Sequence, residues 1–383
     1  MNHPWLLPEY VEDILPPYAR QAEALRRQLL DMYDRYGYEL ICPPLIEYLD
    51  SLLTGAAGDL DLKTFKVVDG LSGRMMGVRA DMTPQAARID AHLLNRAGTT
   101  RLCYAGPVLH AKPEGLMSSR EPYQLGAELF GHDGIEADQE ILELLLASLA
   151  ATTLADVRVS LGHVGLFRAL AVAAGLDGAT GQPVFRALRA KDMPELMELT
   201  RDVAEPWRSA FLRLPELYGD ATVIETARQA LPDLPGVKRA LDDLAELLSA
   251  NGTANLSVDL ADLRGYGYHT GVVFAAYVGG QAAAVALGGR YDGAGTVFGR
   301  TRPATGFSLD LRRILASLPD PSPRAGILAV QQDSAELSAR ISELRRAGER
   351  VVVEFAGQVS APAETGCDRK LALVAGSWQV VPL

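Results

Sequence analysis

Four short segments place charged, hydroxyl and phenol side chains between glycines and apolar residues. They are RADMTPQAAR (79–88), REPYQLGAELFG (120–131), LRGYGYHTG (263–271) and LGGRYDG (287–293). In a shared pocket, their carboxylates and hydroxyls could accept hydrogen bonds from a ligand, and their arginines could hold an anion. Each segment is weak alone, because a glutamate on a strand is more often structural and GGRYDG is usually a turn. Four together predict one site.

Strand-like runs surround these segments. Apolar or alternating runs cover 102–109, 123–131, 157–164, 272–280 and 282–289, with glycine, proline and charge between them. The pair Gly279-Gly280 has the spacing of a tight hairpin turn between the last two runs. These runs predict a largely antiparallel sheet within an α+β fold.

Helical periodicity precedes and interrupts the strand-like runs. Residues 17–36 carry apolar side chains at three- and four-residue steps, typical of an amphipathic helix that Gly37 can end. The following run, YELICPPLIEY (38–48), contains two prolines, which favour an edge or interface strand. Residues 165–254 change to a pattern rich in alanine, leucine, arginine and glutamate, and we expect a helical insertion there.

The sequence therefore predicts three parts. Residues 1–164 and 255–318 would form the sheet-bearing core, and 165–254 the helical insertion. A proline-rich span, PDPSPR (319–324), reads as a linker. Residues 324–383 would then form a small C-terminal α/β domain, with strands near 326–330, 351–355 and 369–376 and a helix near 334–349.

Composition narrows the classes of function. The 383 residues are 48% hydrophobic and 22% charged, as in ordinary folded proteins, and three distant cysteines fit reduced thiols. We expect a cytoplasmic protein without a signal peptide or membrane segment, and without a metal or other cofactor. The net charge of -11, with seven basic and seven acidic residues from Arg324 onward, disfavours tRNA as a partner.

The order of the motifs resembles histidyl-tRNA synthetase, a class II synthetase, over roughly residues 8–165 and 255–316. The resemblance rests on DILPP, GYELICPPLIEYLD, R-x-D-x-T, QLGAELFG, LRGYGYHTGVVF, GGRYD and TGFSLDLRR, which occur in the family's order. It implies a class II antiparallel sheet flanked by helices. It also implies a homodimer through a helix and strand, the motif 1-like element, that carries Pro44.

The resemblance assigns a histidine pocket. It implies that Asp81 and Thr83 hold the α-amino group, while Gln124 contacts the amino-acid backbone and Glu128 the imidazole. The same pocket would be completed by Arg264, Tyr268 and Tyr291. A carboxylate and a hydroxyl suit an ammonium group, and a carboxylate facing an imidazole N–H gives selectivity that an apolar pocket lacks.

The catalytic half departs from the family. His110 stands where motif 2 has its arginine, Lys112 replaces an acidic residue, and Asp310 replaces the second glycine of motif 3. Beside Arg264, a glycine (Gly267) replaces an aspartate and His269 a tyrosine. Losing one charge-stabilising donor typically costs about 100- to 1000-fold in rate, so efficient adenylation is not expected.

Arginines of the catalytic half persist. Arg120 and Arg313 match family positions and could still bind an anion. Fixed cations of this kind are what a phosphate needs. We therefore expect some capacity for anions in a chain that does not adenylate.

A synthetase-like body with a kept pocket and lost catalytic residues resembles the regulatory subunits of ATP phosphoribosyltransferase. That resemblance implies a non-catalytic chain that activates the short-form catalytic subunit, its partner in a hetero-oligomer. It also implies histidine feedback on the first step of histidine biosynthesis. Two alternatives stay open: a divergent, active histidyl-tRNA synthetase that forms histidyl-adenylate, and a synthetase-like binding module for another enzyme or an RNA.

Overall fold

The chain forms two compact units in a computed structural model. The structure describes residues 5–53, 58–113, 115, 118–176, 178–252, 255–265, 268–293, 295–296, 299–321, 325–357 and 362–383. The larger unit comprises residues 1–15 and 19–318, and the smaller one residues 16–18 and 319–383. The candidate pocket segments all belong to the larger unit, which is described first.

A nine-stranded sheet forms the centre of the larger unit. Its strand order is β1-β5-β6-β12-β11-β10-β7-β9-β8, and all neighbours are antiparallel except β1 with β5 and β7 with β9. The bounds in chain order are β1 Glu39–Leu40, β5 Thr100–Pro107, β6 Tyr123–Phe130, β7 Val157–His163, β8 Tyr218–Gly219, β9 Leu256–Asp259, β10 Val272–Val278, β11 Ala286–Arg290 and β12 Ala304–Asp310. The predicted antiparallel character and the α+β class are confirmed.

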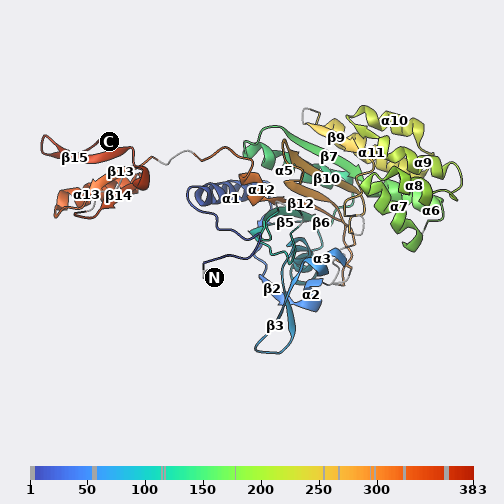
Figure 1. The fold of residues 1–383 in the computed structure, drawn as a ribbon, viewed down its shortest axis with the longest axis horizontal. Coiled ribbons are helices and arrows are strands. Elements are labelled where there is room, and N and C mark those ends of the chain that lie inside the picture. The colour runs from blue at the N-terminus through green and yellow to red at the C-terminus, as the bar shows by residue number, and fades with distance from the viewer. Residues whose placement is uncertain are drawn as a thin grey trace. The chain divides into compact units, whose positions relative to one another are not determined.

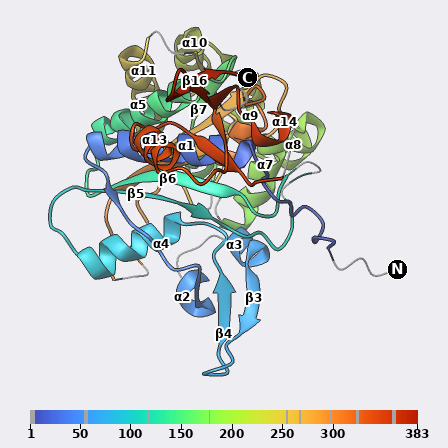
Figure 2. The ribbon, with the colours of Figure 1, turned by 90° about the vertical axis from the view of Figure 1, so that its left-hand side faces the viewer.

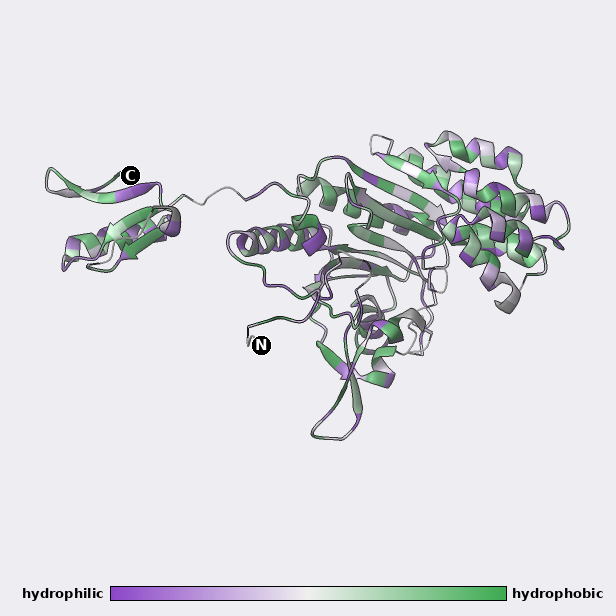
Figure 3. Cartoon of the chain, viewed as in Figure 1, coloured by the Kyte–Doolittle hydropathy of each residue, from purple (hydrophilic) through white to green (hydrophobic). Residues whose placement is uncertain are grey.

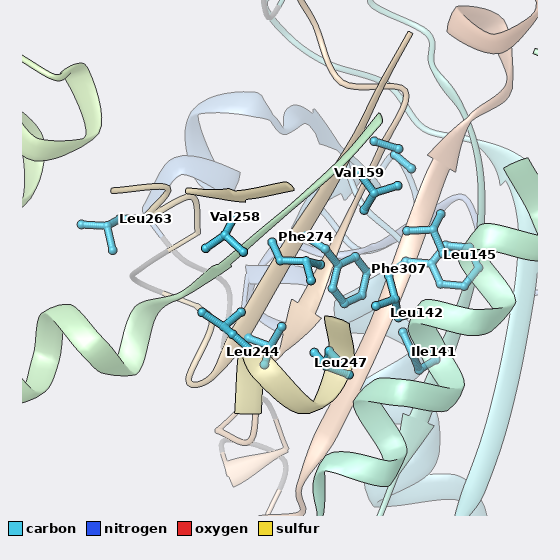
Figure 4. Packing of buried hydrophobic residues seen from close by; sticks show 14 of the residues in the cluster. Ile141, Leu142, Leu145, Val159, Leu244, Leu247, Val258, Leu263, Phe274 and Phe307 are labelled. Atoms are coloured by element: carbon cyan, nitrogen blue, oxygen red, sulfur yellow. The ribbon is translucent and has the colours of Figure 1, made fainter. Parts of the chain in front are cut away.

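Two helices, α1 (Tyr18–Arg35) and α5 (Ile135–Ala151), pack on one face of this sheet. The Tyr33 ring of α1 meets the Phe307 ring of β12 edge-on, with centroids 6.0 Å apart. Figure 4 shows Ile141, Leu142 and Leu145 of α5 directed toward the same strands. Because this face is filled by apolar side chains, polar side chains of the central strands must use the opposite face.

The region between β7 and β9 is mainly helical. Its elements gather at the β7–β9 end of the sheet (Figure 1). They are α6 Val164–Ala173, α7 Gly178–Ala190, α8 Met193–Leu199, α9 Trp207–Arg213, the 3-10 turn Leu214–Glu216, α10 Thr222–Ala230 and α11 Pro235–Ala250. Leu244 and Leu247 of α11 join the central core (Figure 4).

A separate three-stranded sheet, in the order β2-β4-β3, lies between β1 and β5 in the sequence. Figure 2 shows its β3–β4 hairpin extending away from β5 and β6. The elements of this region are β2 Ile46–Tyr48, α2 Leu49–Leu53, α3 Gly58–Lys63, β3 Phe65–Val68, β4 Met75–Val78, α4 Thr83–Arg88 and the π-helical turn Ile89–Leu94. Helix α4 begins within the first candidate segment.

The smaller unit contains a four-stranded sheet in the order β14-β13-β15-β16. Its elements are β13 Ile327–Val330, α13 Ala335–Arg346, β14 Val351–Glu354, α14 Pro362–Thr365, β15 Arg369–Val374 and β16 Ser377–Pro382. Ile327, Leu337 and Leu371 lie in its own apolar core. Figure 3 shows hydrophobic residues along its strands and a mixture of both kinds on its helix.

The predicted hairpin at Gly279-Gly280 is wrong in its extent. A turn does form there, since the Gln281 amide donates to the Val278 carbonyl at 3.1 Å. Strand β11, however, begins only at Ala286, which pairs with Ala276. The predicted strand at 282–289 therefore starts four residues too early, because a run of small apolar residues fits an irregular loop as well as a strand.

Two further observations concern the predicted linker and the expectation that the chain has no membrane segment. Residues 322–324 of the predicted linker lie outside the described residues. Among the helices that the structure describes, none combines the length and apolar character needed to cross a bilayer.

Candidate functional site

A cavity of about 380 Å³ opens on the polar face of the nine-stranded sheet. All seven side chains predicted for the histidine pocket line it: Asp81, Thr83, Gln124, Glu128, Arg264, Tyr268 and Tyr291. They come from β6, from the start of α4, and from the loops beside β10 and β11. The four sequence segments are thus brought together at one place.

Strand β6 explains the placement of two of these side chains. Its residues alternate between faces, as in any strand. Leu125, Ala127 and Leu129 enter the core under α1 and α5, whereas Gln124 and Glu128 line the cavity. The pattern QLGAEL therefore presents an amide and a carboxylate, four residues apart along the strand, to the same side.

One glycine makes room for the buried carboxylate and another for the Tyr104 ring beside it. Gly306 of β12 lies directly opposite Glu128, and a β-carbon at Gly306 would overlap that carboxylate. Gly126 lies opposite Tyr104, where a β-carbon would come within 2.7 Å of the phenol ring. Side chains at either position would displace the groups that fill this face.

Glu128 is fully buried and is held by hydroxyl groups. The Tyr104 hydroxyl donates to Oε1 at 2.8 Å, and the Tyr291 hydroxyl donates to Oε2. Burial raises the pKa of Glu128 to about 8, although these hydrogen bonds, together with one from Thr83, lower it in part. The negative charge of Asp81 raises it further. The carboxyl group is therefore mostly protonated at neutral pH when no ligand is bound.

Asp81 organises a second group of side chains in the cavity lining. Its Oδ1 accepts a hydrogen bond from Gln124 Nε2 at 2.7 Å and from the Thr83 amide at 3.0 Å. The Gln124 Oε1 in turn accepts from the Met82 amide at 2.8 Å. The Thr83 hydroxyl lies 3.1 Å from the Tyr104 hydroxyl. One network thus connects Asp81 to Glu128.

Two tyrosines form a wall of the cavity. The rings of Tyr268 and Tyr291 stack with centroids 4.9 Å apart and planes 20° apart. The Tyr268 hydroxyl is buried and has no hydrogen-bond partner among the described residues. Beside it, burial lowers the pKa of His269 to about 4, so this imidazole is neutral. A ligand atom could satisfy the Tyr268 hydroxyl, which otherwise bears a desolvation cost.

The arginines that line the cavity are each matched by a carboxylate. Arg264 makes two hydrogen bonds with Asp262, one of them from Nε at 2.7 Å. Arg313 lies with its Nε 3.2 Å from Asp310 Oδ2, and its Nη1 donates to the Ala284 carbonyl at 2.9 Å. Arg264 therefore lines the cavity as predicted, but its guanidinium is already hydrogen-bonded to Asp262, two residues earlier in the chain.

The other predicted residues are more dispersed. Arg120 is not part of the cavity lining, and its Nε donates to the His110 carbonyl at 3.1 Å. His110 lines the cavity, with its Nε2 at 3.0 Å from the Ala80 carbonyl oxygen. Lys112 is exposed and lies outside the lining. Gly267 lies outside the described residues.

Sequence reasoning missed two residues of the site. Tyr104 joins Glu128 to Thr83, and Asp262 neutralises Arg264. A signal for Tyr104 was present, because it lies in the strand that pairs with β6 and faces a glycine. Asp262 lies after strand β9 and two residues before Arg264. This spacing alone does not predict a contact between the two side chains.

Within the described ranges, no group of three or more histidine, cysteine or acidic side chains could hold a metal ion. The site is built instead from hydroxyls, carboxylates and aromatic rings. Groups of these kinds are suited to bind a ligand through hydrogen bonds.

Comparison with known proteins gives two family matches. Residues 10–314 match the family model for histidyl-tRNA synthetase. Residues 324–381 match the model for the ATP phosphoribosyltransferase subunit HisZ C-terminal domain. The synthetase-like region thus contains the whole cavity, and the second match covers most of the smaller unit.

Full-length relatives agree with this division. The chain is 55% identical over 379 residues to an ATP phosphoribosyltransferase regulatory subunit from Azoarcus sp. (strain BH72), with 99% of each chain covered. It is 53% identical over 378 residues to the subunit of the same name from Burkholderia mallei (strain SAVP1), again with 99% of each covered.

Solved structures share the fold. An ATP phosphoribosyltransferase regulatory subunit/histidyl-tRNA synthetase from Bacillus halodurans has a TM-score of 0.85 at 28% identity, covering 95% of this chain and 97% of that one. Histidyl-tRNA synthetase from Nostoc sp. PCC 7120 has a TM-score of 0.80 at 18% identity, covering 99% and 97%, which shows the fold alone. The predicted class II synthetase-like fold is confirmed. On the full-length identities, the chain belongs to the family of ATP phosphoribosyltransferase regulatory subunits.

Proposed function

We propose that this chain senses histidine through the cavity around Glu128 and passes the signal to the catalytic subunit of ATP phosphoribosyltransferase. Its family gives the coarse role, a non-catalytic regulatory subunit in histidine biosynthesis, and favours it over an active synthetase. The observation that carries the finer proposal is the single network from Asp81 to Glu128. It offers partners for both ends of an amino acid.

The Asp81 end suits an α-ammonium group. Among the described residues, both hydrogen bonds to this carboxylate reach Oδ1, so Oδ2 is available to a ligand. The Thr83 hydroxyl lies next to it and can accept a further N–H. Because Gln124 fixes the carboxylate from the side, the ammonium would meet a group already held in place.

The Glu128 end suits an imidazole. A neutral imidazole carries one N–H donor and one nitrogen acceptor. Glu128 can take the donor, and the buried Tyr268 hydroxyl, which has no partner in the described part of the chain, can donate to the acceptor. A ligand without these two nitrogens would leave the Tyr268 hydroxyl unsatisfied, at a cost of about 1–3 kcal/mol, and would bring Glu128 no donor beyond its two tyrosines.

Regulation requires only that histidine binds two states of the assembly with different affinities. A coupling of about 1–3 kcal/mol is typical of such systems. The proposal therefore needs no bond-making residue in this chain. It includes activation of a short-form catalytic subunit, a hetero-oligomer and a cytoplasmic location.

We also propose a homodimer through the motif 1-like stretch. Leu40, Leu45, Ile46 and Tyr48 are exposed apolar residues around Pro44. Several exposed apolar residues in one short stretch are a reason to expect an interface there. Light scattering should show a dimer that Ile46→Glu converts to monomer, while Val172→Glu, on the exposed side of α6, leaves it a dimer. A monomeric parent chain would refute this part.

Reconstitution tests the main proposal. Mixing the chain with a short ATP phosphoribosyltransferase subunit should raise the activity of that subunit and make histidine inhibit it. Glu128→Gln and Asp81→Ala should each keep the activation and weaken the inhibition. The matched control is Glu121→Gln, whose parent carboxylate pairs with Arg312 outside the cavity lining. Failure of the two proteins to co-elute, or unchanged inhibition in both pocket variants, would contradict the proposal.

A further inference from the structure

We propose that the cavity contains a latent anion site, in which Asp310 and Asp262 act as internal counter-ions for Arg313 and Arg264. Removing either carboxylate should release a cation to an inorganic phosphoanion such as pyrophosphate. The inference goes beyond histidine sensing. It concerns the part of the cavity that the Asp81–Glu128 network does not use.

The first counter-ion is Asp310, at the end of β12. Its Oδ2 lies 3.2 Å from Arg313 Nε, and its Oδ1 accepts the Arg312 amide at 3.1 Å at the start of α12 (Leu311–Leu315). Both side chains of the pair are mostly buried, with 16% and 19% of their surfaces exposed. The arginine therefore faces a fixed negative charge at short range inside the cavity wall.

The second counter-ion is Asp262. It holds Arg264 through two hydrogen bonds and is itself 7% exposed, against 35% for the arginine. The planar guanidinium is thus bound side-on by a carboxylate, the geometry in which it would otherwise bind a phosphate. The same pairing thus occurs twice, once where β12 meets α12 and once in the loop before β10.

The charges of the lining residues explain why the parent cavity should not bind a polyanion. The described lining residues include four carboxylates, from Asp81, Glu128, Asp262 and Asp310. Against them stand three cations, from Lys63, Arg264 and Arg313. Even with Glu128 protonated the charges only balance, so a phosphoanion would find no net positive field.

The latent site borders the amino-acid network. Asp310 pairs in register with Gln124, the residue that holds Asp81. Side chains at such positions lie about 4.5–5.5 Å apart at their β-carbons. A zwitterionic ligand can therefore occupy one part of the cavity while the adjacent arginines stay closed by their own carboxylates.

Calorimetry with inorganic pyrophosphate on the full chain tests the inference. The parent should show no saturable binding at millimolar pyrophosphate, and Asp310→Asn should bind at least about tenfold more tightly. Asparagine is also a good helix N-cap, so it keeps the hydrogen bond to the Arg312 amide. Adding Arg313→Ala to this variant should abolish the gain.

Two further variants decide the outcome. Asp262→Asn should produce a gain that requires Arg264, and it settles the matter if Asp310→Asn does not fold. Glu121→Gln changes the net charge equally but lies outside the lining, so it should produce none. The inference is overturned if the parent binds as tightly as the variants, if folded variants gain nothing, or if Glu121→Gln gains equally. Histidine does not enter this readout, so the sensing proposal fails or stands separately.

Discussion

The two halves of the cavity satisfy their carboxylates in different ways. Glu128 is held by the hydroxyls of Tyr104 and Tyr291, and no lysine or arginine of the described residues forms an ion pair with it. Asp310 and Asp262 each lie against an arginine. A carboxyl group held only by neutral hydroxyls can still gain from a ligand that brings an N–H or a positive charge. A carboxylate already paired with an arginine gains little from such a ligand.

The raised pKa of Glu128 is the physical mark of this difference. Burial without a cation disfavours the charged form, and a ligand that brings an N–H or a positive charge removes the penalty. The closed half gains nothing from such a ligand. We therefore expect recognition at Glu128, and we expect that the arginines paired with Asp310 and Asp262 need not bind a nucleotide.

The largest expected effect comes from filling the space beside Glu128. In Gly306→Ala the new β-carbon displaces the carboxylate, so histidine affinity should fall at least about 100-fold and stability by about 1–3 kcal/mol. Gly98→Ala is the control, because a β-carbon there meets nothing within 4 Å. Calorimetry and urea unfolding measure both. Full affinity in Gly306→Ala would break the comparison.

The next effect concerns stability and pH. The folded-state pKa of Glu128, about 8, exceeds its ordinary value of 4.5, so its stabilising contribution is complete below pH 4.5 and is lost as pH rises to 8. From pH 6 to 9 the ligand-free parent should lose about 2–3 kcal/mol more than Glu128→Gln. Urea unfolding at both values measures this. If both proteins lost the same unfolding free energy, the pKa of the Glu128 carboxyl group would not be raised by burial.

The affinity for histidine should also depend on pH. Between about pH 6.5, the ordinary pKa of imidazole, and pH 8, ligand and Glu128 together carry one proton before and after binding, so affinity stays level. Above pH 8 binding must take up a proton, and affinity should fall about tenfold per unit. In Glu128→Gln, affinity should still change as the ligand amino group titrates, but the fall caused by titration of Glu128 should be absent. An identical alkaline fall in both proteins would contradict the assignment.

The smallest effect tests the supporting hydroxyl. Tyr104→Phe removes one donor to Glu128 and the partner of Thr83, which raises the pKa of Glu128 further and should weaken histidine binding about three- to tenfold. Tyr38→Phe is the matched control, because its hydroxyl donates to Glu140 outside the cavity lining at 2.8 Å. If both variants weakened histidine binding equally, Tyr104 would have no specific role in binding.

Much of the larger unit was predictable from periodicity. Helix α1 and strands β5 and β6 follow from apolar spacing, because each buries one face against the same core. In the three-stranded sheet, β2 lies within the predicted edge strand at 38–48, but β3 and β4 were missed, since strands of four residues leave only a short pattern. Strand β16 was missed as well. The division into core, insertion and C-terminal domain stays a prediction, alongside the two compact units.

The sequence predicted which residues line the cavity, but not which of their side chains contact one another. The motif order brought all seven pocket residues to one cavity. It did not reveal that Arg264 is held by Asp262, or that Asp310 closes Arg313, because such pairs depend on side-chain geometry in loops and at helix starts. The roles assigned to these residues in binding stay proposals.

Calorimetric titration of L-histidine into the full chain near pH 7 tests the central claim most directly. The parent should show one saturable site per chain, with Glu121→Gln unchanged. Glu128→Gln, shown to be folded in the unfolding experiment, should bind at least about 50-fold more weakly, since the imidazole N–H loses its buried carboxylate. Equal affinities for the parent and Glu128→Gln would contradict the account.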